Sequence, residues 1–320
     1  MPKISFKKLR RLLPGIKRNI LLRDYTTFKI GGRARYFLKV KTSVSLIRAT
    51  SIAKKNKLPF FILGKGSNLL VSDKGFKGLI IKIENQNLEI KSNTVICDAG
   101  TPLPLLVNKT AKAGLSGLEW AAGIPGTLGG AIRGNAGAFG SETKNLIYEV
   151  RILDEKDNLR KISNKKCNFS YRSSVFKKKK WIILSAILRL KKKNKKNIQS
   201  LVRNYIKYRK EKQPLNYPSA GSVFKNVDFK EIPKNKRESF SKIVKKDPFP
   251  IIPVAYFLSE ANLKGLRIGG AEVSKKHPNF IVNSKKARAG DVKKLISLIK
   301  KRIKKKFGIN LEEEIQYLGF

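Results

Sequence analysis

Residues 122–140 read AGIPGTLGGAIRGNAGAFG, and a second glycine-rich turn, GKGSN at 64–68, directly follows the apolar run FFIL at 60–63. Glycine permits positive φ and a close approach of the backbone to a ligand, whereas Pro125 stiffens one bend. Such segments can present backbone amides to an anion, although each could equally be a structural turn. Neither contains the P-loop pattern GxxxxGK[ST] or a GxGxxG between a strand and a helix, so both of those phosphate motifs are excluded.

The sequence around these segments predicts a mixture of strands and short helices. A Lys-rich break at 191–196 separates the two halves of the chain. The expected strands are 60–63, 79–83, 94–97, 147–153 and 181–190, and the expected helices are 43–56, 103–112, 198–210 and 291–306. This order favours an α+β fold over a regular βαβ alternation.

The charge of the chain is unusual, because 71 Lys and Arg residues stand against 22 Asp and Glu, a net charge of +49. Such a charge suggests a polyanionic partner at first sight, and a basic nucleic-acid-binding protein is one alternative; it predicts salt-sensitive binding to random DNA. However, the Lys residues lie along the whole chain. We therefore interpret them as compositional drift and expect no specific nucleic-acid partner.

Cysteine and histidine are scarce, with only Cys97, Cys167 and His277. We therefore expect no disulfide framework and no metal site. Residues 1–25 form a basic leader without an apolar core, and the longest apolar run, 181–188, is shorter than the about 20 residues that a membrane span needs. These features predict a cytoplasmic protein without membrane insertion.

An ordered series of motifs resembles the UDP-N-acetylenolpyruvoylglucosamine reductases over roughly residues 26–320. The motifs are TTFKIGG (26–32), LGKGSNLL (63–70), the stretch 122–140, FSYRSSVF (169–176), PSAGSVFKN (218–226), GGAEVSKKHPNFIVN (269–283) and LEEEIQYLG (311–319). The resemblance implies an FAD-binding domain of the FAD-linked oxidase (PCMH) type at 26–192 and an α+β substrate-binding domain at 198–320. The short interval after FSYRSSVF resembles the subclass that lacks an extra tyrosine-bearing loop.

The resemblance also implies a reaction and its partners. NADPH would reduce FAD, and the flavin would pass hydride to the enolpyruvyl β-carbon of a UDP-sugar, giving UDP-N-acetylmuramate for peptidoglycan precursors. The enolate-like intermediate would need a cationic clamp, an acidic or hydrogen-bonding group and a proton donor. Another FAD-linked oxidoreductase on the same flavin fold is the second alternative. We expect a monomer.

Three residues match the family's catalytic positions. Arg172 can hold a carboxylate by two parallel hydrogen bonds, which Lys cannot do. Ser222, in a turn-like Pro-Ser-Ala-Gly-Ser segment, matches the proton donor. Glu314 matches the last catalytic residue, while Glu312 and Glu313 are interpreted as solvated neighbours.

The remaining site residues follow from the same motifs. FAD contacts are implied for Gly64, Lys65, Gly66, Ser67, Asn68, Leu69, Ile124, Pro125, Gly126, Thr127, Gly129, Gly130, Ala131, Asn135, Ala136 and Gly137, with 27–32 in support. Substrate contacts are implied for Tyr171, Lys225, Asn226 and His277, and Tyr205 and Arg209 are further candidates. Two features depart from the family pattern: Arg133 replaces an apolar residue, and a polar insertion at 227–254 is expected to form a surface loop or small helix.

Overall fold

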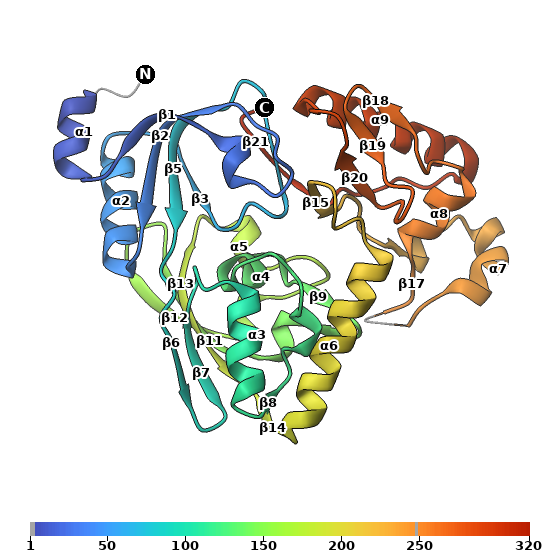
Figure 1. Cartoon of the computed structure of the whole chain (residues 1–320), viewed down its shortest axis with the longest axis horizontal. Helices are drawn as coiled ribbons and strands as arrows, with labels where there is room; N and C mark the ends of the chain where they lie inside the picture. Colours follow the sequence, from blue (N-terminus) through green and yellow to red (C-terminus); the bar gives the residue numbers. More distant parts are fainter. Residues whose placement is uncertain (1–3, 247–248) are drawn as a thin grey trace. The chain divides into compact units, whose positions relative to one another are not determined.

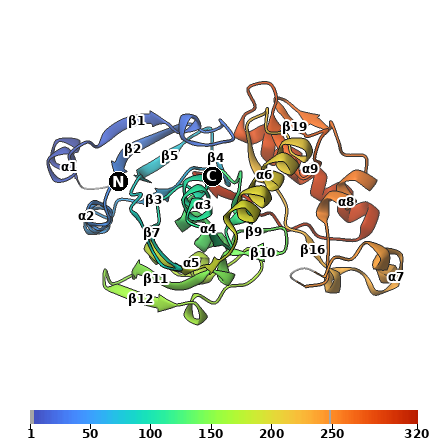
Figure 2. The ribbon, with the colours of Figure 1, turned by 60° about the horizontal axis from the view of Figure 1, so that its bottom comes forward.

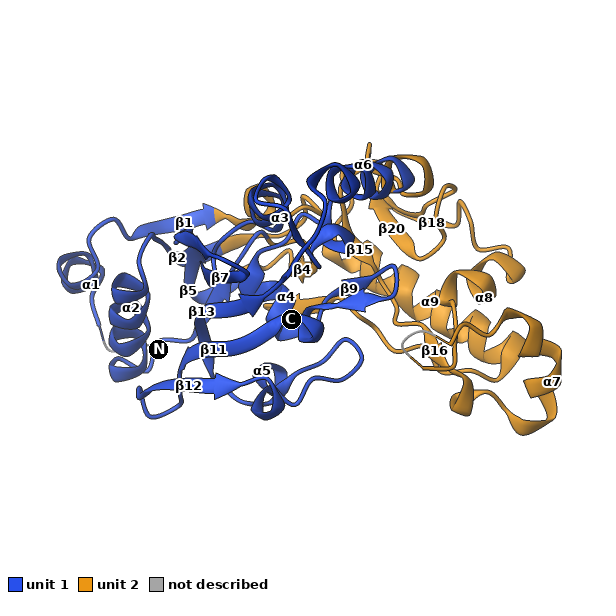
Figure 3. Ribbon diagram, turned by 90° about the horizontal axis from the view of Figure 1, so that it is seen from below, with its two compact units in different colours: residues 1–20, 34–65, 76–208 blue, residues 21–33, 66–75, 209–320 orange. Residues whose placement is uncertain are grey.

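The computed structural model describes residues 4–246 and 249–320, which divide into two compact units (Figure 3). Unit 1 contains residues 1–20, 34–65 and 76–208, and unit 2 contains residues 21–33, 66–75 and 209–320. Each unit therefore draws on three stretches of the chain. The functional domains predicted at 26–192 and 198–320 are continuous stretches and stay a prediction.

The first sheet of unit 1 has the strand order β1-β2-β5-β3 (Figure 2). Its strands are β1 (Lys17–Leu21), β2 (Arg33–Val40), β5 (Phe76–Ile83) and β3 (Phe60–Leu63). Strands β2 and β3 both pair with β5 in parallel, and helix α2 (Ser43–Lys55) makes the crossover that parallel strands require. Helix α2 and the short α1 (Phe6–Leu12) share one apolar core with this sheet.

The second sheet of unit 1 is antiparallel, with the order β12-β11-β13-β7-β6. Its strands are β6 (Leu88–Lys91), β7 (Thr94–Asp98), β11 (Ile147–Leu153), β12 (Leu159–Ser163) and β13 (Ile182–Arg189). Unit 1 also contains the helices α3 (Leu103–Lys112), α4 (Leu128–Gly134), α5 (Val175–Lys178) and α6 (Lys195–Lys212). Helix α6 continues into unit 2. Apolar side chains of this sheet and of α3 and α4 form the second core.

Unit 2 is built on a four-stranded sheet with the order β15-β20-β19-β18 and on the long helix α9 (Figure 1). The elements are β15 (Ser219–Ser222), β18 (Arg267–Ile268), β19 (Ala271–Val273), β20 (Phe280–Asn283), α8 (Val254–Glu260) and α9 (Ala289–Phe307). Ala271, Val273 and Ile281 share a core with the buried face of α9. Because side chains alternate along a strand, Glu272, Phe280 and Val282 lie on the opposite face of the sheet.

Short strands and turns complete the chain. They are β4 (Leu69–Val71) with β21 (Gln316–Leu318), β8 (Leu115–Ser116) with β14 (Lys191–Lys192), β9 (Gly137–Ala138) with β10 (Ser141–Glu142), β16 (Val227–Asp228) with β17 (Ile251–Ile252), the small helix α7 (Arg237–Phe240), and the 3₁₀ turns η1 (Leu22–Tyr25), η2 (Glu119–Ala121), η3 (Thr143–Asn145), η4 (Lys165–Cys167), η5 (Phe229–Glu231), η6 (Lys234–Lys236) and η7 (Ser241–Ile243). No helix in the described residues is long and apolar enough to cross a membrane.

The predicted helices and strands are confirmed, three of them with identical bounds, at 60–63, 103–112 and 147–153. The described residues of the insertion at 227–254 form 3₁₀ turns, the β16–β17 strand pair and the small helix α7, so the expected small helix is confirmed. The segment is not only a surface loop, because Val227, Ile232, Phe240 and Ile252 are buried in the core of unit 2. The sequence did not predict the structure of the basic leader at 1–25, which contains α1, β1 and η1. Strand β1 was missed because its residues KRNIL are exposed or half-buried and lack alternation.

Candidate active site

The two glycine-rich segments meet in unit 1 at Gly64 and Thr127. Strand β3 ends at Leu63, and the carbonyl of Gly64 accepts a hydrogen bond of 2.5 Å from Lys82 Nζ. A Cβ on Gly64 would lie 2.7 Å from Thr127 Oγ1, so this position has no room for a side chain. The chain therefore passes close over Thr127 as it enters the predicted FAD turn.

Helix α4 carries much of the second glycine-rich segment. Thr127 caps the helix, and its hydroxyl accepts a hydrogen bond of 3.3 Å from the Gly130 N–H. Gly129 packs on Ala99: its N–H donates to the Ala99 carbonyl at 2.8 Å, and a Cβ there would lie 3.0 Å from the Ala99 Cβ. By contrast, a Cβ on Gly134 would meet nothing within 4 Å. The segment thus combines tight backbone packing with an open edge, which suits a bound cofactor.

Asn135 ends α4 in the left-handed conformation, with φ 43° and ψ 55°. Its fully buried side chain donates to Glu142 Oε2 at 2.7 Å and to the Ser170 carbonyl at 3.0 Å, and it accepts from the Lys144 N–H at 3.0 Å. Asn is one of the few residues besides Gly that tolerate this backbone conformation. Its amide links the end of α4, the β9–β10 hairpin and the turn that carries Arg172.

Arg172 lies in a tight turn in which Ser170 and Ser173 exchange both backbone hydrogen bonds at 3.0 Å. Its φ of 52° is a strained value for a non-glycine residue, and such strain often accompanies function. Arg172 Nη2 donates to the Gly137 carbonyl at 2.9 Å, and the guanidinium lies 5.0 Å from the centre of the Tyr171 ring. Two predicted site residues, Tyr171 and Gly137, are therefore in contact with the predicted catalytic arginine.

Arg133 is turned toward the protein. Its guanidinium donates to the Phe176 carbonyl, and burial lowers the pKa of Arg133. The Ser174 hydroxyl in turn donates to the Arg133 carbonyl at 2.8 Å. Arg133 is thus hydrogen-bonded to Ser174 and Phe176, in the segment that follows the Arg172 turn.

Residues 66–68 of the first glycine-rich turn belong to unit 2. Hydrogen bonds connect them to two other predicted site segments. The Thr27 N–H donates to the Gly66 carbonyl at 3.3 Å, and the Thr27 hydroxyl donates to the Ser219 carbonyl at 2.7 Å. The side chain of Asn68 donates to the Glu314 carbonyl at 3.1 Å. Residues 66–68 are therefore connected both to the strand of Ser222 and to the segment of Glu314.

Ser222 and Glu314 lie in neighbouring, hydrogen-bonded segments. The Glu314 N–H donates to the Val223 carbonyl at 2.7 Å, and Phe224 forms an antiparallel bridge with Glu313. Both Ser222 and Glu314 are half-buried. The structure thus brings together two of the three predicted catalytic residues, whereas Arg172 belongs to unit 1.

The three adjacent glutamates have different surroundings. Glu312 is exposed and forms an ion pair with Lys225, and Glu313 forms one of 2.9 Å with Lys300 Nζ. Both carboxylates are therefore neutralised by nearby ammonium groups. Glu314, whose backbone binds both Val223 and Asn68, remains the best candidate of the three.

Asn226 and His277 make contacts that stabilise the protein itself. Asn226 Oδ1 accepts from the Val254 N–H at 3.2 Å, at the start of α8. His277 Nδ1 accepts from the Asn279 N–H at 3.3 Å, and burial lowers the pKa of His277, which favours the neutral ring. Their predicted substrate contacts therefore stay predictions beside these structural roles.

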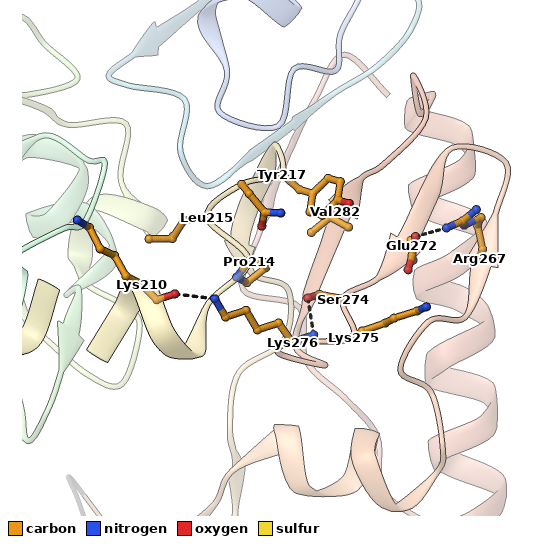
Figure 4. A pocket seen from close by; sticks show the side chains of 11 residues that line it. Lys210, Pro214, Leu215, Tyr217, Arg267, Glu272, Ser274, Lys275, Lys276 and Val282 are labelled. Atoms are coloured by element: carbon orange, nitrogen blue, oxygen red, sulfur yellow. Dashed lines mark hydrogen bonds and ion pairs between the residues drawn. The ribbon is translucent and has the colours of Figure 1, made fainter. Parts of the chain in front are cut away.

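Unit 2 also contains a pocket of about 570 Å³ that the sequence did not reveal (Figure 4). It is lined by Lys210, Pro214, Leu215, Asn216, Tyr217, Arg267, Glu272, Ser274, Lys275, Lys276 and Val282. Four of these residues are cationic, and the one carboxylate, Glu272, is paired with Arg267. Lys276 Nζ donates to the Lys210 carbonyl at 2.6 Å. The lining is thus suited to an anion.

The pocket lies on the same face of the sheet as Ser222. Ser222 pairs with Phe280, and Val282, two residues further along β20, lines the pocket. Residues two apart on a strand share a face and are about 7 Å apart. The only sequence signal was the pair Lys275–Lys276, which directly precedes His277 in a matching motif. In the described part of the chain, no cluster of three or more His, Cys, Asp or Glu residues could hold a metal ion.

Family models match both halves of the chain. Residues 213–318 match the model of the UDP-N-acetylenolpyruvoylglucosamine reductase C-terminal domain, and residues 34–163 match that of an FAD binding domain. The chain is 39% identical to the UDP-N-acetylenolpyruvoylglucosamine reductase of Caldanaerobacter subterraneus over 326 residues, covering 100% of this chain and 99% of the relative. It is 42% identical to that of Thermotoga sp. strain RQ2, covering 91% and 90%.

A solved structure shows the same fold over nearly the whole chain. The crystal structure of UDP-N-acetylenolpyruvylglucosamine reductase from Thermus caldophilus matches with a TM-score of 0.76 at 33% identity, covering 95% of this chain and 99% of that chain. These matches confirm the predicted α+β architecture, with an FAD-binding domain followed by a C-terminal domain. The chain belongs to the UDP-N-acetylenolpyruvoylglucosamine reductase family.

Proposed function

We propose that this protein reduces UDP-N-acetyl-3-O-(1-carboxyvinyl)-glucosamine to UDP-N-acetylmuramate with NADPH, in peptidoglycan precursor synthesis. The observation that carries the proposal is the pairing of the Glu314 segment with the strand end of Ser222, through the 2.7 Å bond between the Glu314 N–H and the Val223 carbonyl. When bound, FAD supplies the hydride carrier between NADPH and the enolpyruvyl group. The names of the relatives support the same substrate class.

The residues that we assign to FAD are those of the two glycine-rich segments. Gly64 and Gly129 bring the backbone close to Thr127 and Ala99, and Gly134 borders open space. We assign the flavin to the domain at 26–192 and the sugar nucleotide to the domain at 198–320. We also place the chain in the subclass without the extra tyrosine-bearing loop.

The roles of the three catalytic residues follow from the charge that develops on the substrate. Arg172 binds the carboxylate of the enolpyruvyl group, and its bond to the Gly137 carbonyl orients the guanidinium. Ser222 donates the proton to the α-carbon. Glu314, held beside Ser222 by its backbone, stabilises the intermediate at the carboxylate.

The cationic pocket supports a nucleotide substrate. Lys275, Lys276 and Arg267 suit phosphate oxygens, and Tyr217 and Leu215 offer apolar surface to a base. Val282, which lines the pocket, is about 7 Å along β20 from Phe280, the partner of Ser222. We therefore assign the diphosphate of the UDP-sugar to the pocket and its enolpyruvyl group to the position of Ser222.

An anaerobic experiment tests the proposed reaction. The purified protein should be yellow, NADPH should bleach it, and the enolpyruvyl sugar nucleotide should restore the colour with formation of UDP-N-acetylmuramate. Ser222→Ala should bleach normally but recover slowly, whereas Ser219→Ala, on the same strand, should behave like the parent protein. Failure of the colour to return in the parent protein would overturn the proposal, and equal loss of both steps in Ser222→Ala would overturn the role of Ser222.

A further inference from the structure

Lys82 is the charged residue in the buried part of a mostly apolar strand. It lies in β5, between Ile81 and Ile83, and only 8% of its surface is exposed. Leu79, Ile81 and Ile83 share a core with α2, so the alternation along the strand directs Lys82 to the other face of the sheet. There it pairs in register with Leu63, the last residue of β3. The Lys82 side chain therefore lies where the chain leaves β3 for the Gly64–Leu69 turn.

The ammonium group of Lys82 has too few partners for a buried cation. It donates one hydrogen bond, of 2.5 Å, to the Gly64 carbonyl, and residues 4–246 and 249–320 provide it with no other hydrogen bond or ion pair. An ammonium has three N–H donors. A buried charge without an opposite charge is costly, so the site favours an additional anionic partner.

The neighbouring charges increase this cost. Burial, together with the ammonium groups of Lys65 and Lys39, lowers the pKa of Lys82 to about 8. Glu84 acts in the opposite direction, but its carboxylate forms an ion pair of 3.2 Å with Lys39. The surroundings of Lys82 are thus more cationic than anionic in the protein alone.

We propose that Lys82 is a cofactor-binding residue whose buried ammonium pairs with the diphosphate of FAD at the Gly64–Leu69 turn. This inference rests on the proposed binding of FAD by that turn. Lys82 supplies the full positive charge that backbone amides cannot supply, and it also holds the Gly64 carbonyl at the end of β3. Ligands of open α/β sheets commonly bind at the carboxyl ends of parallel strands, and β3 ends here.

The proposal predicts a specific pH dependence. A bound diphosphate favours the charged lysine and raises its pKa above 8, so the protonated protein binds FAD more tightly. Affinity should be constant below pH 8 and fall as the pH rises through that value. Between pH 7 and pH 9 the dissociation constant should rise about tenfold. In the protein without FAD, the lowered pKa destabilises the fold below pH 8, and this penalty is relieved at higher pH.

Equilibrium dialysis of the holoprotein, followed by the fluorescence of released flavin, measures these effects. Lys82→Met keeps the length of the side chain and removes the charge; it should weaken FAD binding at least tenfold at pH 7 and abolish the change between pH 7 and pH 9. Lys77→Met, at an exposed position of the same strand, is the matched control and should match the parent protein in both respects. The melting temperature of Lys82→Met without FAD should not fall, because a buried charge has been removed.

Each outcome separates this inference from the proposed function. A parent protein that binds no FAD would overturn the proposed function itself. A parent protein that binds FAD with an affinity independent of pH, or a Lys82→Met variant that binds FAD normally, would overturn only the role of Lys82. If Lys82→Met fails to fold, the pH dependence of the parent and Lys77→Met proteins decides the question.

Discussion

The turn that carries Arg172 and the strand end that carries Ser222 are both fixed by a buried asparagine, but in different ways. Asn135 binds a carboxylate, Glu142, as well as the Ser170 carbonyl, and has a left-handed backbone. Asn279 binds only backbone, donating to the Phe224 carbonyl and accepting from its N–H, both at 2.9 Å. The turn therefore depends on side chains and tolerated strain, whereas the strand end depends on ordinary β-sheet pairing.

The largest effect should come from Arg172→Lys. Lys cannot bind a carboxylate by two parallel bonds or reproduce the bond to Gly137, so kcat/KM for the enolpyruvyl substrate should fall about a thousandfold. Bleaching of the flavin by NADPH should be unchanged. Stopped-flow absorbance measures the two steps separately, and a loss confined to bleaching would contradict the assignment.

Glu314→Gln should reduce turnover by about a hundredfold, because the strand pairing that positions this residue stays intact while the acidic group is lost. Glu313→Gln is the matched control, since its carboxylate already pairs with Lys300. Steady-state kinetics measure the turnover of the two variants. A larger fall in turnover for Glu313→Gln than for Glu314→Gln would assign the catalytic role to Glu313.

Asn135→Ala should lower kcat by about tenfold, because the Arg172 turn loses its anchor and the buried Glu142 loses a hydrogen bond. The free energy of unfolding should fall by about 2 kcal/mol. Asn279→Ala should cost similar stability but leave the flavin step with NADPH unaffected. Denaturant unfolding combined with single-turnover kinetics tests the pair, and a normal kcat in Asn135→Ala would remove the proposed link to Arg172.

The smallest effect should come from the pocket. Lys275→Ala should raise KM for the sugar nucleotide a few-fold with little change in kcat, because Lys275 is exposed and contributes one screened charge. Added salt should reduce the difference from the parent protein. A change in kcat alone would show that Lys275 does not act in substrate binding.

The sequence predicted best those elements whose periodicity reflects burial. Helix α9 followed from Val292, Leu295, Ile296, Ile299 and Ile303, all of which are buried. The sequence alone could not show that Lys82 is buried, because a lysine is normally solvated and this chain contains many lysines. It also could not separate Glu312 and Glu313 from Glu314 by their ion pairs, since Lys225 and Lys300 approach them only in the folded chain.

The parallel pair of β4 and β21 has a consequence for biosynthesis. Gln316 pairs with Leu69 and Leu318 with Val71, so residues 69–71 find their partners only after a much later part of the chain has been translated. Contacts of such long sequence separation form slowly, and they cannot form at all on a nascent chain that still lacks residues 316–318. We therefore expect the turn at 66–68, which leads into β4, to acquire its final form late. FAD binding would then follow the synthesis of residues 316–318.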